Sequence, residues 1–292
     1  MSVAIVTAVS KSPIVWMNGT LIPADEVRVS PFDLGWSVGW AAFETMPGYD
    51  GRVFGFLRHF ERLKHSAGVM GIYVPAPEII ETAVSQVLDM NGLGSGRSRI
   101  RLSLSSGDHS LIGSDETKDV QGSVMVTAVN VVEQKNQVVL QASPFSHNER
   151  SGLSGCKTSS YGDNLVALRQ AHKAGADEAI MVNTVGQLCE CATANIFLVS
   201  NGKLMTPSLD TGCLPGVTRS IIIEIAREDG LTVEEGEFGM IDVSDADEIF
   251  LTSSMRGVQS AVMMRSGSEA VGAVTHRLSE IYHKRVREEL GL

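Results

Sequence analysis

A lysine near the middle of the chain is the first residue whose setting suggests chemistry. Lys157 lies in GCKTSSYGDNLVALRQAHKAG, after a turn of small residues and before an apolar-patterned helix. A lysine amine is a nucleophile when it is neutral, but most loop lysines are solvated surface residues. The meaning of Lys157 therefore depends on the residues that accompany it.

A glutamate in an apolar segment is the second such residue. Glu190 lies in GQLCECATANIFLVS, where small and apolar neighbours predict a buried strand and turn. A buried carboxylate costs several kcal/mol unless it meets a cation or hydrogen-bond donors. A strand-end glutamate that faces water is an equally good interpretation of this segment by itself.

Three further segments could bind an anion. In CLPGVTRSIIIEIA, a helix is expected to begin near Val217 and Thr218, where free backbone N–H groups form an anion site. Arg62 lies on a predicted helix in HFERLKHSAG, and FLTSSMRG ends a predicted strand with hydroxyl residues. Most such junctions bind nothing and most helix arginines are solvated, so each segment is informative only together with the others.

Several common catalytic and metal-binding motifs are absent from the sequence. There is no G-x-x-x-x-G-K-[ST], no H-E-x-x-H and no G-x-S-x-G. The seven histidines do not fall at metal-ligand spacing, and Cys189 and Cys191 have no nearby Cys or His to complete a zinc site. No metal is predicted, and the four cysteines are expected to be buried free thiols in a reducing cytoplasm.

Length, charge and hydropathy limit the class of protein. A chain of 292 residues suggests two domains, and 43% hydrophobic with 20% charged residues is ordinary for a globular enzyme. The net charge of −10 argues against nucleic acid or an anionic membrane as the main partner. The longest uncharged apolar stretch, Val120–Val132, is shorter than the about 18 residues of a membrane span, and the N-terminus lacks the basic region of a signal peptide.

Hydrophobic periodicity predicts the elements that must position these residues. In the first part of the chain we expect a hairpin over 14–22, helices over 56–69 and 77–90, and strands over 98–106 and 123–132. In the later part we expect strands over 138–144, 178–183, 186–191, 195–200, 202–207 and 248–254, and helices over 164–174, 218–229 and 275–290. On the helix at 56–69, Leu57, Phe60 and Leu63 are expected on the apolar face, with Arg62 elsewhere.

A short polar break divides this pattern into two domains. Residues 133–136 are expected to link a small domain of residues 1–132 to a larger domain of residues 137–292. The strands arrive mostly in hairpin-connected groups with a few helices between them. This order favours an α+β pair of domains over a doubly wound sheet.

Taken together and in this order, the five segments resemble the fold-type IV family of pyridoxal-phosphate enzymes, the class IV aminotransferases. The similarity runs from about Trp16 to about Ala261, and the separation between Lys157 and Glu190 is typical of the family. The family includes branched-chain and D-amino-acid aminotransferases, amine transaminases of R selectivity and aminodeoxychorismate lyases. The resemblance implies a small N-terminal α/β-sandwich-like domain, a larger C-terminal pseudo-barrel domain, and a cofactor between them.

The resemblance also implies a role for each residue near the cofactor, pyridoxal 5′-phosphate. Lys157 matches the lysine that forms a Schiff base and moves the substrate proton, and Glu190 matches the carboxylate that pairs with the pyridinium nitrogen. The phosphate ligands would be Arg62, the N–H groups of Val217 and Thr218, and the Ser254 hydroxyl. Leu214, Asn195 and Tyr161 match positions against or near the cofactor.

The substrate pocket is less well defined by the resemblance. Phe43 in WAAFET resembles branched-chain aminotransferases, although Thr45 stands where they usually have glycine. Arg101 falls where those enzymes carry a strand arginine, and an ion-paired sheet arginine is an equally good interpretation. His109 lies in a loop without the arginine of a standard D-alanine enzyme, and Met255 completes the expected substrate-binding residues.

Transamination is the reaction that the resemblance favours. An amino group would pass from an amino acid or amine to a 2-keto acid, through a Lys157 Schiff base and the pyridoxamine form. The alternatives are aminodeoxychorismate lyase, which forms 4-aminobenzoate and pyruvate, and a pyridoxal-phosphate-binding protein without turnover. The intact lysine–glutamate pair argues against the last. We expect small amino and keto acids as partners, a homodimer in which each subunit lends a loop to its partner, and a cytoplasmic location.

Overall fold

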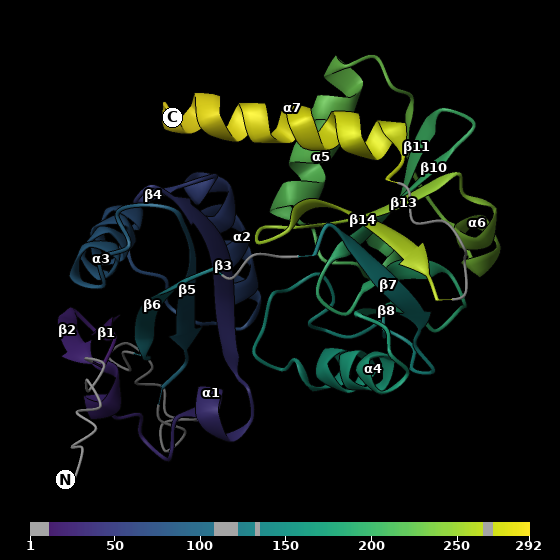
Figure 1. The fold of residues 1–292 in the computed structure, drawn as a ribbon. Coiled ribbons are helices and arrows are strands. Elements are labelled where there is room, and N and C mark those ends of the chain that lie inside the picture. The colour runs from purple at the N-terminus through teal and green to yellow at the C-terminus, as the bar shows by residue number, and fades with distance from the viewer. Residues whose placement is uncertain (1–11, 108–121, 132–134, 265–270) are drawn as a thin grey trace, which may run out of the picture.

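Two β-sheets with helices packed against them make up the molecule (Figure 1). The structure, a computed structural model, describes residues 12–107, 122–131, 135–264 and 271–292. The first sheet is built from residues up to Asn130 and the second from Gln137 onward. The linker predicted at 133–136 falls between them but lies partly outside the described residues, so the domain boundary stays a prediction.

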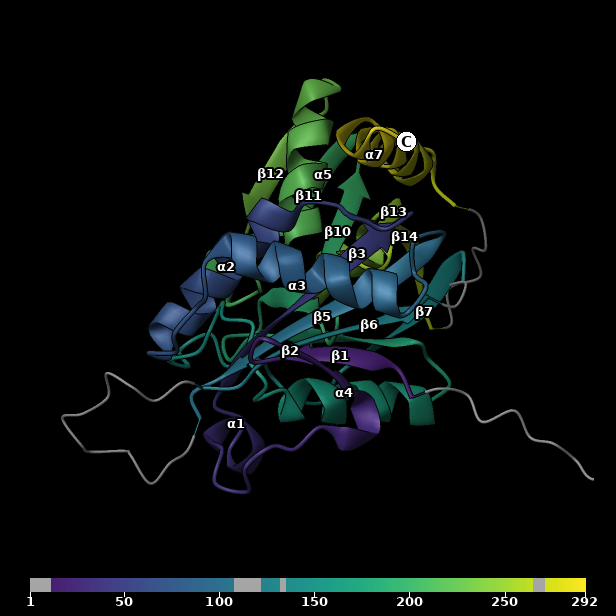
Figure 2. The same cartoon turned by 90° about the vertical axis from the view of Figure 1, so that its left-hand side faces the viewer.

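In the described residues, the first sheet has six antiparallel strands. Their order is β2 (Thr20–Pro23), β1 (Ile14–Met17), β6 (Val124–Asn130), β5 (Arg97–Ser105), β3 (Ala41–Tyr49) and β4 (Arg52–Val53). The predicted Asn18-Gly19 turn joins β1 to β2, and both residues have the positive φ that this turn requires. Helices α2 (Phe56–Val69) and α3 (Pro77–Met90) lie over one face of the sheet (Figure 2) and build a hydrophobic core with it.

The second sheet has eight strands within the ranges that the structure describes, and it contains both parallel and antiparallel pairs. Their order is β12 (Val233–Gly236), β11 (Lys203–Pro207), β10 (Asn195–Ser200), β13 (Glu248–Ser253), β14 (Gly257–Met263), β7 (Gln137–Ala142), β8 (Glu178–Val182) and β9 (Leu188–Cys191). The Cys191 N–H donates to the Ala194 carbonyl at 2.8 Å, which brings the edge strand β9 back to the start of β10. The sheet therefore curls into a half-barrel, as the predicted pseudo-barrel requires.

The remaining helices cover the second sheet and join it to the first. They are α4 (Gly162–Lys173), α5 (Val217–Glu228), α6 (Met240–Asp245) and α7 (Ala273–Leu290), and a short helix α1 (Leu34–Ser37) precedes β3. Phe54, just before α2, packs edge-on against the fully buried Tyr282 of α7 at 5.8 Å between ring centroids. The Arg52 guanidinium also donates to the Leu290 carbonyl, so α7 fastens the two halves together.

Helix α2 differs from its predicted orientation in two residues. Leu57, expected on the apolar face, is 67% exposed, whereas Arg62, expected off that face, is buried. Phe60 and Leu63 are buried as predicted. The difference arises because Glu44 on β3 supplies a buried carboxylate for Arg62, and a pattern of apolar residues cannot reveal such a partner.

All four cysteines are free; Cys189, Cys191 and Cys213 are buried as expected, and Cys156 is half-buried. Within the described ranges, no three His, Cys, Asp or Glu side chains come together as a metal site. None of the helices in the described residues has the length and apolar character that a membrane crossing requires.

Candidate active site

A cavity of about 1060 Å³ opens between the two sheets. Every predicted site residue that the structure describes lines it. These are Phe43, Arg62, Arg101, Lys157, Tyr161, Glu190, Asn195, Leu214, Val217, Thr218, Ser254 and Met255. His109 lies outside the described residues. Residues far apart in the sequence thus surround one space.

Backbone pairing between the two halves positions Lys157. The segment after β7 runs antiparallel to the start of β3: the Phe43 N–H donates to the Lys157 carbonyl at 3.0 Å and the Ser159 N–H to the Ala41 carbonyl at 2.7 Å. The Lys157 N–H donates to Oγ of Ser66 on α2 at 2.9 Å. Both bonds of Lys157 tie a loop residue to the first half of the molecule, which fixes where its side chain starts.

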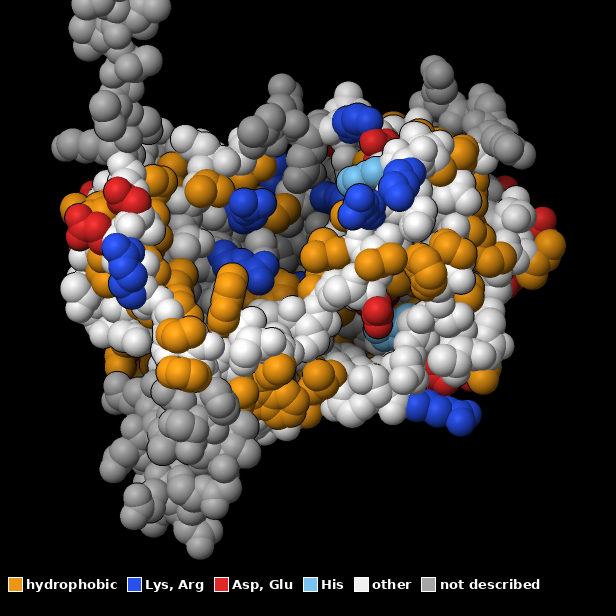
Figure 3. All heavy atoms as spheres, turned by 90° about the horizontal axis from the view of Figure 1, so that it is seen from below, with side chains coloured by type: hydrophobic (Ala, Val, Ile, Leu, Met, Phe, Trp, Pro, Cys, Tyr) orange, Lys and Arg blue, Asp and Glu red, His pale blue; other side chains and the backbone are white. Residues whose placement is uncertain are grey.

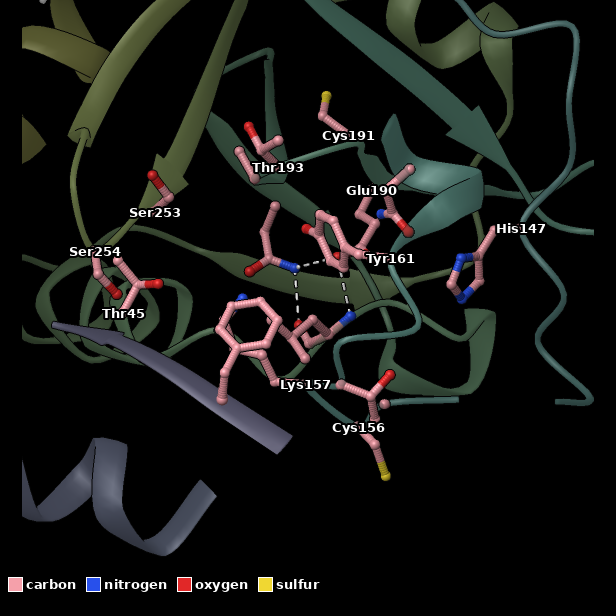
Figure 4. A pocket seen from close by; sticks show the side chains of 18 of the residues that line it. Thr45, His147, Cys156, Lys157, Tyr161, Glu190, Cys191, Thr193, Ser253 and Ser254 are labelled. Atoms are coloured by element: carbon pink, nitrogen blue, oxygen red, sulfur yellow. Dashed lines mark hydrogen bonds between the residues drawn. The ribbon is translucent and has the colours of Figure 1, made fainter. Parts of the chain in front are cut away.

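The Lys157 side chain lies in the cavity among rings and charges (Figure 4). Its Nζ is 4.5 Å from the Phe43 ring centroid and 5.8 Å from that of Tyr161. Burial, with the positive charge of Arg62, lowers the pKa of Lys157 to about 8. At pH 7 about a tenth of the amine is therefore neutral and able to act as a nucleophile, far more than for an ordinary lysine.

Glu190 on β9 is a buried carboxylate, 8% exposed, without a direct cationic partner among the described residues. Its Oε2 accepts hydrogen bonds from the Leu214 N–H at 3.0 Å and from Nδ2 of Asn195 at 3.4 Å. Burial raises the pKa of Glu190 to about 7, although the Leu214 N–H opposes this shift. Such a group favours a cation placed in the cavity beside it.

Asn195 at the start of β10 holds the wall next to Glu190. Its Nδ2 donates to the Leu214 carbonyl at 2.8 Å. Gly216 lies directly against this amide, and a Cβ there would overlap with Oδ1 of Asn195. The Pro215-Gly216 break is thus required for close packing of the loop on Asn195, and α5 begins immediately after it.

The start of α5 and Arg62 form the basic end of the cavity. Gly216 is the N-cap of α5 and has no side chain that could cap the helix. The N–H groups of Val217 and Thr218 therefore remain available to donate hydrogen bonds to a ligand. Nη1 of Arg62 donates to the Pro215 carbonyl at 3.2 Å, which places the guanidinium beside that helix start. Ser254, in the turn after β13, lines the same cavity.

Glu44 fixes the orientation of Arg62, which the sequence did not reveal. The Glu44 carboxylate accepts from Nε of Arg62 at 2.7 Å and from Nη2 at 2.8 Å. This bidentate pair fixes the guanidinium, and Nη1 lies outside it, beside the Pro215 carbonyl and the start of α5. Burial would raise the pKa of Glu44, but the Arg62 charge and hydrogen bonds from His59 and Arg62 hold it at about 2.

Basic side chains of β5 line the opposite part of the cavity. Cζ of Arg101 lies 3.5 Å from the Phe43 ring centroid, so the same ring contacts both Arg101 and Lys157. Arg99, two residues earlier on the same strand face, also lines the cavity. Neither arginine has an ion-pair partner in the described part of the chain, so the ion-paired interpretation of Arg101 is not what the structure shows there. Arg99 was not among the predicted site residues, although the alternation of Arg97, Arg99 and Arg101 was a usable signal.

Comparison with known proteins decides the family. The family model described as amino-transferase class IV matches residues 41–262. The chain belongs to this family. Membership confirms the predicted family, the α+β fold with its half-barrel, and pyridoxal phosphate as the cofactor.

Relatives in this class IV family carry several names. A branched-chain-amino-acid aminotransferase-like protein 2 of Arabidopsis thaliana is 28% identical over 92% of this chain, and the chain spans only 49% of that protein. An aminodeoxychorismate lyase of Bacillus subtilis is also 28% identical, over 94% of both chains. The sequence comparisons therefore do not separate transaminase from lyase.

Solved structures of class IV enzymes share the fold. The branched-chain aminotransferase of Thermoproteus uzoniensis with norvaline has a TM-score of 0.84 at 28% identity, covering 94% of both chains. A T.th. branched-chain amino acid aminotransferase with pyridoxamine 5′-phosphate has a TM-score of 0.85 at 28% identity, again covering 94% of both chains. These similarities support the arrangement of two sheets around one cavity.

Proposed function

We propose that this class IV protein is an aminotransferase that passes an amino group from an amino acid or amine to a 2-keto acid. The observation that carries the proposal is the placement of Lys157 and Glu190 in one cavity, with a basic end formed by Arg62 and the start of α5. A buried carboxylate with no ion pair in the described part of the chain, an amine of lowered pKa and an anion site match three parts of pyridoxal phosphate.

The residues present fit this cofactor. Glu190 would hold the protonated ring nitrogen, with Leu214 and Asn195 keeping the carboxylate in place. The phosphate would meet the guanidinium of Arg62, the N–H groups that begin α5, and the Ser254 hydroxyl.

The chemistry divides between the cofactor and the side chains around it. When bound, pyridoxal phosphate supplies an electron-withdrawing ring that carries the substrate nitrogen and spreads the charge left by a departing proton. Nζ of Lys157 then takes and returns that proton, which its pKa of about 8 allows near neutral pH. The Tyr161 hydroxyl donates to the Ala192 carbonyl at 2.8 Å and so keeps its ring beside Lys157.

Two arginines without an ion-pair partner among the described residues support a substrate that carries a carboxylate. Arg101 stacks on Phe43, and Arg99 continues the basic strip along β5. Burial lowers the pKa of Arg101, and the Arg99 charge adds to this effect, so both cations gain from a nearby anion. Met255, beyond Ser254, lines the same cavity and would contact the substrate side chain.

Single-turnover mixing with amino acids tests the reaction. Conversion to the pyridoxamine form, reversed by 2-oxoglutarate or pyruvate, is expected of a transaminase. Pyruvate released from aminodeoxychorismate without an acceptor would identify the lyase, which the equal identity to the Bacillus subtilis enzyme makes the second candidate. A protein that binds the cofactor but changes neither substrate would be the binding protein without turnover. Lys157→Ala is the control and is expected to abolish both reactions.

A homodimer is part of the proposal. Five large hydrophobic side chains remain exposed around α1 and α4: Phe32, Trp36, Val38, Leu165 and Val166. Oγ of Ser160 donates to the Gly39 carbonyl at 3.2 Å, which ties the two segments together. Figure 3 shows the underside of the molecule, with a hollow that contains basic side chains and hydrophobic side chains around it. A second copy on this patch would bury apolar surface and border the cavity.

A cytoplasmic location is also proposed. Its support is the free state of all four cysteines, since a reducing compartment keeps thiols unpaired. Fractionation of cells that produce the tagged full chain tests it, and recovery outside the cytoplasm would contradict it.

A further inference from the structure

A buried histidine joins two of the proposed phosphate ligands. His59 on α2 is 1% exposed, and its Nδ1 lies 2.7 Å from Oε2 of Glu44, the carboxylate that holds Arg62. Its Nε2 lies 3.4 Å from Oγ of Ser254. The path from Arg62 to Ser254 therefore passes through Glu44 and His59, inside the protein.

The number of protons on this path limits what each group can donate. Glu44 is ionised and only accepts, so Nδ1 of His59 donates to it. If the ring is neutral, Nε2 is an acceptor, and the single hydroxyl proton of Ser254 is directed to His59. If the ring carries a second proton, Nε2 donates to Oγ, and Ser254 can direct its proton outward. Ser254 can thus serve both His59 and a phosphate only when His59 is protonated.

We propose that His59 is a positioning residue that takes up one proton when the cofactor phosphate binds and thereby turns the Ser254 hydroxyl toward that phosphate. The inference rests on the proposed function, since it needs a phosphate beside Arg62 and Ser254. The proton comes from solvent and is held at Nε2, and no other bond forms or breaks. His59 does not touch the phosphate and acts through Ser254.

The charges that face His59 explain why the second proton arrives only with the phosphate. Burial lowers the pKa of His59, and the positive charges of Arg62 on α2 and Lys157 on the loop after β7 lower it further. Glu44 on β3 opposes them, and Ser254 in the β13–β14 turn is neutral. A phosphate dianion beside Arg62 adds negative charge and reverses the balance in favour of the protonated ring.

A double-mutant cycle tests whether His59 acts through Ser254. The probe is 4′-deoxypyridoxine 5′-phosphate, which has the ring and the phosphate but no aldehyde to react with Lys157. Calorimetry at pH 8 on the full chain compares wild type, His59→Asn, Ser254→Ala and the double variant. Each single change is expected to raise the Kd about tenfold, since each removes the same charge-assisted hydrogen bond. The double variant is expected to bind no more weakly than Ser254→Ala alone.

Matched variants separate positioning from folding. His65→Asn changes an exposed histidine on the same helix and is expected to bind as wild type does. His59→Gln places an amide N–H near the former Nε2 without needing a proton, so it is expected to restore most of the affinity. If His59→Asn fails to fold, His59→Gln still provides the comparison for proton uptake.

Proton uptake measures the second half of the inference. The same titrations are run in buffers of different ionisation enthalpy. Wild type is expected to take up as much as one more proton per bound ligand than His59→Asn or His59→Gln. The difference between variants removes the ionisations of the ligand and of Glu190, which all of them share.

Each outcome supports or overturns a defined statement. Additive losses in the double variant overturn the positioning role, and equal proton uptake in wild type and both His59 variants overturns the proton-linked step. A wild-type chain that binds neither this probe nor pyridoxal phosphate overturns the proposed function itself. A wild-type chain that binds both but lacks the coupling overturns only the role of His59.

Discussion

At the scale of single residues, Glu190 is a buried carboxylate whose ionisation is made unfavourable by burial. Its folded-state pKa of about 7 lies above its unfolded value of 4.5, so the folded chain holds a proton that the unfolded chain releases. The associated stability is present below the unfolded pKa and is lost as pH rises through 7. We predict that the cofactor-free chain loses up to about 3 kcal/mol between pH 4.5 and 8 from this group. Urea unfolding at a series of pH values measures it.

The control for Glu190 is Glu190→Gln, which keeps the shape and removes the titration. The variant should lack this part of the pH dependence. It should also slow turnover by at least about tenfold, because an amide does not keep the ring nitrogen protonated. If both chains lose the same stability with pH, Glu190 is ionised without cost. If Glu190→Gln leaves turnover unchanged, the assignment of Glu190 to the ring nitrogen is wrong.

Lys157 sets a second pH dependence at the residue scale. Only the neutral amine attacks an aldehyde, and its pKa is about 8. The rate at which the cofactor-free chain captures pyridoxal phosphate should therefore rise about tenfold for each pH unit below 8 and level off above it. Stopped-flow absorbance measures this rate. A midpoint near the ordinary lysine pKa of about 10.4 would show that the cavity does not tune the amine.

At the scale of elements, the contact between the start of β10 and the loop that leads into α5 determines the geometry of the basic end of the cavity. We predict that Gly216→Ala displaces Asn195 and, through Leu214, both donors to Glu190. Overpacking of this kind costs about 1–3 kcal/mol in stability, and the shift of the helix start should raise the Kd for pyridoxal phosphate more than tenfold. Urea unfolding and absorbance titration measure the two effects.

A matched glycine serves as the control for Gly216. Gly239 is the N-cap of α6, and a Cβ there would meet no atom closer than 4.0 Å. Gly239→Ala should leave the cofactor Kd unchanged. Equal effects of the two substitutions would mean that the contact with Asn195 is not what matters.

At the scale of the whole molecule, the exposed patch around α1 predicts self-association. Trp36 is 76% exposed, and replacing it with glutamate would place a charge in an apolar interface. We predict that Trp36→Glu shifts the protein from dimer to monomer at micromolar concentration, as measured by analytical ultracentrifugation. Met90→Glu, at an exposed hydrophobic position on α3, is the control and should stay dimeric. A wild-type protein that is monomeric would contradict the homodimer proposal.

The sequence by itself determined most of the elements and much of the site, although β3, β12 and β14 were not predicted. Helices α2 and α3 begin and end at the predicted residues because their apolar periodicity and flanking breaks are local signals. Lys157, Glu190 and the Pro215-Gly216 break were recognisable because their residue types are unusual in their local surroundings. Their order along the chain was enough to predict the family, which the family model confirms.

Only the tertiary structure decided which side chains meet. Arg62 is buried rather than solvated because Glu44 approaches it from another element. The role proposed for His59 depends on its contact with Ser254, which comes from the later half of the chain. Arg101 stacks on Phe43 through pairing of β3 with β5. Such contacts depend on long-range packing, and a local pattern does not contain the partner that makes a buried charge favourable.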